Sequence, residues 1–188
     1  MNIKPWQRIE FLPLAVMGLM ALTRLFHFGS AFSLPDASLA VFFLAGIGFS
    51  SLWFFALLLL EAVVIDYLAI TQFSVSDFCI SPAYICLVPT YAVMWFAGRY
   101  CKAHKSLSFV DSLKTFGLAV IATTGAFVIS SGSFYIFSGR FGQLSWNQYL
   151  TQTTQYYPPY LSAALIYIVI GLAIVKLWKA TAIAVAES

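Results

Sequence analysis

Cys79 is the residue whose type and position point to the most specific chemistry in this sequence. It stands in a short polar connection, three residues before Pro82, where an apolar segment begins. Proline is favoured in the first turn of a helix, so Cys79 is predicted to lie at a helix start. There the positive end of the helix dipole favours the thiolate, a soft ligand for a metal that accepts sulfur. The alternative is that Cys79 packs as a small hydrophobic residue.

Several ionisable residues lie within apolar stretches, where an unpaired charge is costly. Arg24 and Asp66 fall at similar depths of two such stretches, so we expect an ion pair that neutralises both. This pair either locks two helices together or belongs to a site. Glu61 lies deeper than Asp66. Its carboxyl group either relays protons or packs as a protonated or hydrogen-bonded group. His27 follows Arg24 by three residues and shares its helix face, either as a satisfied polar side chain or as a ligand.

The elements that position these residues are predicted to be membrane-spanning helices. Of the 188 residues, 61% are hydrophobic and only 9% are charged, whereas soluble domains carry about 25% charged residues. The apolar stretches are longer than the alternating segments of a membrane β-barrel. The Lys and Arg residues form no stripe for phosphates, which argues against nucleic acid as a partner. We predict an all-α integral membrane protein in contact with the lipid bilayer, with one transmembrane domain over residues 1–188.

Six helical spans are predicted, at about 11–28, 39–49, 52–71, 82–97, 116–137 and 160–177. A span needs about 20 apolar residues to cross some 30 Å of hydrocarbon, and the second is short for this. Most Lys and Arg residues then fall on the face that carries both chain ends, which makes the N- and C-termini cytoplasmic. The opposite, outer face holds the loops 29–38, 72–81 and 138–159.

Polar chemistry gathers on this outer face. Asp36 and Cys79 lie in two of its loops, and the third loop is rich in amides, hydroxyls and aromatic rings between Trp146 and Tyr157. Such a mixture is typical of an aromatic belt at the membrane surface, and it also suits a lid over a large ligand with many amide groups. The sequence contains no Walker loop, zincin motif or nucleophile elbow, so any ATP must be used by a partner.

Several segments resemble a known family. The sequences TRLFHFG at 23–29 and LPDASLA at 34–40, the pair Asp66-Tyr67, and Cys79 followed by SPAY at 81–84 are similar to the BtuM-type cobalamin transporters of Gram-negative bacteria. These are solitary relatives of the substrate-binding S-components of energy-coupling-factor transporters. The resemblance extends over nearly the whole chain and implies an S-component-like bundle of six helices.

The resemblance implies an uptake protein of the bacterial inner membrane that binds cobalamin from the periplasmic face. It implies that Cys79 is an axial ligand of cobalt and that its thiolate displaces cyanide from cyanocobalamin, so that binding is coupled to decyanation. It also implies that His27, Asp66 and Tyr84 belong to the pocket. We add Asp36 to the pocket because of its place in an outer loop.

The first predicted span departs from the wider S-component pattern. In that family a small-xxx-small motif docks this helix against an ATP-hydrolysing energising module. Here Ala15, Gly18 and Ala21 are spaced by three residues, and leucines occupy the positions four after the first two. We therefore do not expect this chain to dock on such a module.

Two other functions are compatible with the sequence. A membrane thiol oxidoreductase would pair Cys79 with Cys86 or with a cysteine of a partner protein. The internal pair is disfavoured, because seven residues along a helix separate α-carbons by about 10 Å, beyond the roughly 7 Å that a disulfide allows. The chain would otherwise be an S-component for a different vitamin, in which Cys79 only packs.

Overall fold

The computed structural model describes residues 5–25, 34–49, 51–73, 76–102, 109–141 and 145–186, and for residues 5–11, 79, 109, 178–180 and 182–186 it describes the backbone only. Seven α-helices occupy most of these ranges: α1 (Pro5–Leu25), α2 (Ser38–Gly48), α3 (Leu52–Phe73), α4 (Leu87–Lys102), α5 (Phe109–Phe137), α6 (Trp146–Thr154) and α7 (Tyr157–Ala186). Two short 3-10 helices, η1 (Asp77–Cys79) and η2 (Pro82–Cys86), precede α4. Within the described ranges the fold is all-helical, as predicted.

Among the residues that the structure describes, three helical stretches are long and apolar enough to cross a membrane: Leu52–Phe73, Val110–Phe137 and Tyr157–Leu177. The apolar parts of the first two helices, Leu12–Leu25 and Ser38–Gly48, are shorter. At 1.5 Å per residue the 11 residues of α2 extend about 16 Å, roughly half the thickness of the hydrocarbon layer. The chain therefore has the character of a membrane protein, and the count of six spans stays a prediction.

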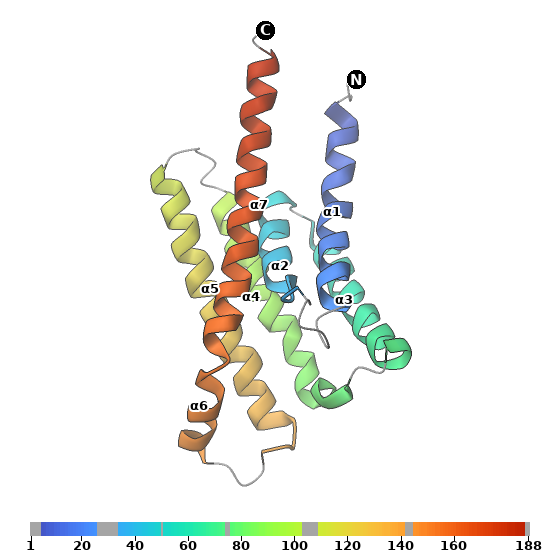
Figure 1. Cartoon of the computed structure of the whole chain (residues 1–188), viewed down its shortest axis with the longest axis vertical. Coiled ribbons are helices and arrows are strands. Elements are labelled where there is room, and N and C mark those ends of the chain that lie inside the picture. The colour runs from blue at the N-terminus through green and yellow to red at the C-terminus, as the bar shows by residue number, and fades with distance from the viewer. Residues whose placement is uncertain are drawn as a thin grey trace.

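The short helix α2 lies in the centre of the bundle together with α4. Figure 1 shows α5 and α7 on one side of this pair and α1 and α3 on the other. The start of α1 and the end of α7 lie at one end of the molecule, and α6 lies at the opposite end. This arrangement places α2 where it is covered on all sides, and most of its side chains are buried.

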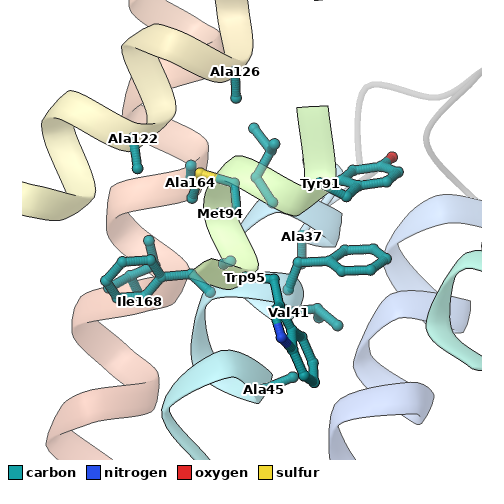
Figure 2. Close-up of a cluster of buried hydrophobic side chains, with 14 of the residues drawn as sticks. Ala37, Val41, Ala45, Tyr91, Met94, Trp95, Ala122, Ala126, Ala164 and Ile168 are labelled. Carbon is teal, nitrogen blue, oxygen red and sulfur yellow. The ribbon is translucent and has the colours of Figure 1, made fainter. Parts of the chain in front are cut away.

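Two glycines allow α2 and α4 to cross closely. A Cβ atom on Gly46 would collide with the carbonyl oxygen of Trp95, and one on Gly98 would collide with that of Phe43. Small residues let helix backbones approach in this way in membrane proteins. Around the crossing, Tyr91, Met94 and Trp95 of α4 pack between alanines and branched residues from α2, α5 and α7 (Figure 2).

The start of the fourth predicted span differs from the expectation. Pro82 begins the 3-10 helix η2, and the α-helix starts only at Leu87. The reason is Pro89, which lacks a backbone N–H and whose ring would clash with the carbonyl of residue 85 in a continuous α-helix. Cys79 is therefore not at the start of an α-helix, and the dipole argument for its thiolate does not hold as predicted.

The same break affects the argument about Cys79 and Cys86. Cys79 ends η1 and Cys86 ends η2, so the two residues do not lie on one continuous helix. The separation of about 10 Å derived from a regular helical rise does not apply to them. The argument from helical spacing against an internal thiol pair therefore loses its premise, and Cys86 is a free thiol in the structure.

The third outer loop also contains an element that was predicted only as a connection. Helix α6 begins after Ser145, whose side chain accepts a hydrogen bond from the backbone N–H of Gln148, while the Gln148 side chain accepts one from the Ser145 N–H. This reciprocal capping box was legible in the sequence as Ser-x-x-Gln.

Candidate functional site

The predicted ion pair between Arg24 and Asp66 is confirmed. Arg24, in the last turn of α1, is only 7% exposed. Its Nε and Nη2 atoms donate to the two carboxylate oxygens of Asp66 in α3, both at 2.6 Å. A bidentate pair of this kind fixes both side chains as well as neutralising them.

Arg24 also binds the start of α2 and the inner face of α4. Its Nη1 atom donates to the Tyr91 hydroxyl at 2.7 Å, to the Ser38 hydroxyl at 3.0 Å and to an Asp36 oxygen at 3.3 Å. The other oxygen of Asp36 accepts from the backbone N–H and the hydroxyl of Ser38. A carboxylate at this helix start is favoured by the helix dipole.

Tyr84 completes the network from η2. Its hydroxyl donates to an Asp66 oxygen at 2.6 Å, so that Asp66 accepts three short hydrogen bonds, two from Arg24 and one from Tyr84. The buried guanidinium is thus tolerated because its donors have partners, as a buried charge requires. Two carboxylates face one guanidinium, which leaves one net negative charge among these described residues.

A cavity of about 690 Å³ opens beside this network. We call the side formed by the network the charged wall, which consists of Arg24, Asp36, Asp66, Tyr84 and Tyr91. The opposite side is contributed by α5, α7 and the turn before α7, and we call it the hydroxyl wall: Ser130, Ser131, Ser133, Phe134, Tyr156, Tyr160 and Ser162. The volume is within the range of roughly 300–1,000 Å³ found for small-molecule pockets.

The structure brings three of the five predicted site residues together. Asp36, Asp66 and Tyr84 line the same cavity and share hydrogen bonds with Arg24 or with one another. His27 lies outside the described residues. Of Cys79 only the backbone is described, as the last residue of η1.

Cys79 lies in the chain between Phe78, which contacts a cavity-lining ring, and Ala83, which lines the cavity. The ring of Phe78 contacts that of Phe134, with centroids 5.6 Å apart, and Phe134 lines the cavity. On the other side of Cys79, Ala83 and Tyr84 line the cavity as well. The guanidinium of Arg140 lies 4.3 Å from the centroid of the Phe78 ring and covers it. The backbone of Cys79 is therefore close in sequence to one segment that lines the cavity and to one ring that packs behind its lining.

The aromatic loop from Trp146 to Tyr157 divides between two roles. Tyr156 lines the cavity, whereas Tyr149 is buried against Tyr135 and donates its hydroxyl to the carbonyl of Ser131. Trp146 packs on Tyr135 at the far end of the bundle. Tyr149 thus supports the cavity wall from behind, whereas most of the other residues from Trp146 to Tyr157 are exposed.

Sequence reasoning missed Tyr91 and the serines of α5 as parts of the site. Tyr91 is a phenol within an apolar run, and a buried phenol usually needs a hydrogen-bond partner, which was an available signal. The serines gave none, because serine is common in membrane helices. Glu61 lies outside the cavity lining, and one of its carboxylate oxygens is buried with no hydrogen-bond partner among the described residues.

The described part of the chain, which includes neither His27 nor the Cys79 side chain, contains no group of three His, Cys, Asp or Glu residues that could hold a metal ion. The described geometry therefore offers a hydrogen-bonding cavity next to one thiol-bearing segment. Comparison of the chain with known protein families gives no matching family model, and comparison with curated proteins gives no match either.

Proposed function

We propose that this chain is a cobalamin-binding uptake protein of a bacterial inner membrane. The observation that carries the proposal is the position of Cys79 between Phe78, which contacts a cavity-lining ring, and Tyr84, which lines the cavity. A corrin seated in the cavity would lie next to the segment that carries Cys79 and would have the hydrogen-bonding side chains of both walls around its amides. The resemblance of the sequence to BtuM-type transporters supports the same assignment.

In the proposed topology the chain crosses the membrane six times, with both termini in the cytoplasm and the cavity open to the periplasm. The start of α1 and the end of α7 lie at the same end of the molecule, as an even number of passes requires. The excess of Lys and Arg in the segments at that end supports its cytoplasmic orientation.

The proposed chemistry is a ligand substitution at cobalt(III). The Cys79 thiolate forms a sulfur–cobalt bond, the bond from cobalt to cyanide carbon breaks, and cyanide leaves with its electron pair. Cobalt keeps its oxidation state, so no reductant is needed. A thiolate is a soft donor suited to a transition metal, and His27, Asp66, Tyr84 and Asp36 are the proposed pocket residues around the bound molecule.

The test is to purify the full chain in detergent with cyanocobalamin and to record the visible spectrum of the bound corrin. We expect shifted corrin bands and release of cyanide from the wild type, and neither from Cys79→Ala. Cys101→Ala, which changes a buried thiol at the opposite end of α4, is the matched control and should behave as the wild type.

Unchanged corrin bands in the wild type, or equal spectra from Cys79→Ala, would contradict cobalt ligation by this residue. Mass spectrometry of the molecule that co-purifies from cells separates the remaining alternatives. A different vitamin in the preparation would replace cobalamin as the substrate of the same cavity.

A further inference from the structure

Most Ser and Thr hydroxyls in the helices that the structure describes are satisfied by their own helix. They donate to a backbone carbonyl three or four residues earlier, which is how Ser and Thr remove the cost of a free hydroxyl in an apolar setting. The threonines that do so at a separation of four are Thr23, Thr71, Thr90, Thr115, Thr124, Thr151 and Thr154.

Ser130 and Ser131 on α5 depart from this pattern. Neither hydroxyl has a hydrogen-bond partner in the described part of the chain, although both residues lie in a helix of membrane-spanning length and line the cavity. Their neighbour Ser133 lines the cavity too, but its hydroxyl donates to the carbonyl of Ser130. The backbone carbonyl of Ser131 accepts a hydrogen bond from the Tyr149 hydroxyl.

The two walls of the cavity therefore differ in what they can still bind. On the charged wall, the carboxylate of Asp66 and the guanidinium of Arg24 are engaged with each other and with Tyr84 and Tyr91. On the hydroxyl wall, Ser130 and Ser131 keep a free donor and free acceptors each. Neutral groups of this kind match a ligand group that both donates and accepts, as a carboxamide does.

We propose that Ser130 and Ser131 form a binding subsite for a neutral carboxamide group of the ligand. The inference rests on the proposed function, since the side chains of cobalamin are carboxamides, and it assigns one part of that molecule to α5. The subsite contributes affinity and orientation, whereas the bond to cobalt is left to Cys79 on the facing segment.

The test measures cyanocobalamin affinity for the full chain in detergent, comparing wild type with the double variant Ser130→Ala/Ser131→Ala. Alanine has the highest helix propensity, so the variant should keep α5 intact. Two lost neutral hydrogen bonds correspond to an affinity about tenfold to a hundredfold weaker. Thr115→Ala, on the same helix but outside the cavity lining and with its hydroxyl donating to the carbonyl of Asp111, is the matched control and should change the affinity less than about threefold.

The spectrum of the bound corrin at saturation is the second measurement. We expect it to be the same in the double variant as in the wild type, because cobalt ligation does not involve these serines. An unchanged affinity of the double variant, or an equal loss in Thr115→Ala, would overturn the subsite and leave the proposed function standing. Failure of the wild type to bind cyanocobalamin would overturn both.

Discussion

The two walls of the cavity are built on opposite principles. The charged wall joins four helical segments, α1, α3, η2 and α4, and the start of α2 through one buried guanidinium, with its strongest hydrogen bonds at 2.6 Å. The hydroxyl wall is made of neutral groups on α5 and α7, among them serines without partners in the described structure. The polar groups of the charged wall hold segments of the chain together by hydrogen bonds. On the hydroxyl wall, the hydroxyls of Ser130 and Ser131 have no hydrogen-bond partner among the described residues.

This difference predicts where substitutions will cost stability and where they will cost binding. Loss of a buried charge that others depend on is expensive, because the remaining charges stay in a poorly solvated place. Loss of a neutral hydroxyl facing a cavity costs little in the empty protein. The three predictions that follow rank these effects from the largest to the smallest.

Arg24→Met should have the largest effect on stability. It removes the cation shared by Asp66, Asp36 and Tyr91 and leaves two carboxylates uncompensated, so we expect a loss of about 3–5 kcal/mol in the free energy of unfolding. Equilibrium unfolding in detergent, titrated with a denaturing detergent, measures it. The matched control is Arg140→Met, an exposed cation over the Phe78 ring, which should cost about 1 kcal/mol or less. Equal losses from the two variants would contradict a central role of Arg24.

The two carboxylates of the charged wall should differ from each other. Asp66 accepts three hydrogen bonds of 2.6 Å, whereas the contact of Asp36 with Arg24 is 3.3 Å long. We expect Asp66→Asn to lower the free energy of unfolding by about 2–3 kcal/mol and Asp36→Asn by about 1 kcal/mol, since hydrogen bonds to charged groups are the stronger ones. The same unfolding titration gives both values. A larger loss from Asp36→Asn would show that hydrogen-bond number and length do not rank the two carboxylates by their contribution to stability.

Two tyrosine hydroxyls give the smallest comparison, between a charge-assisted hydrogen bond of the charged wall and a neutral hydrogen bond outside the cavity lining. Tyr84 donates to a carboxylate at 2.6 Å, and Tyr157 shares a hydrogen bond of 2.7 Å with the neutral hydroxyl of Thr124. Tyr84→Phe should cost about 1.5–3 kcal/mol and Tyr157→Phe about 0.5–1.5 kcal/mol, because only the first bond is charge-assisted. If the thermal unfolding midpoint falls more for Tyr157→Phe, the greater stabilisation assigned to the charge-assisted hydrogen bond of the charged wall is wrong.

Much of the charged wall could be predicted from the sequence because an unpaired charge in an apolar stretch is costly wherever that stretch lies in the fold. An arginine and an aspartate in separate apolar stretches each need a partner, and a pair at similar depth satisfies both. The pairing of Arg24 with Asp66 follows from that need alone. The contribution of Asp36 could be placed on the same face of the molecule, but its link through Ser38 to Arg24 depends on how α2 begins.

The hydroxyl wall could not be predicted in this way. Ser130 and Ser131 look like any serines of an apolar helix, and their free hydroxyls become visible only when the helix is in place beside a cavity. The 3-10 turn before α4 was missed for a different reason. Pro89 prevents the helix from extending back to Pro82, and the effect of a proline on the preceding turn was overlooked although it can be read locally.

The sequence alone determined that the chain has the character of a membrane protein and that its charged residues in apolar stretches need partners. Both follow from the free energy of moving groups out of water. The tertiary structure decided the rest. A half-length α2 enters the centre of the bundle because Gly46 and Gly98 let it approach α4, and its first turn then carries Asp36 to Arg24. Close packing between distant segments thus created both the cavity and the contrast between its walls, since neither is a property of any single helix.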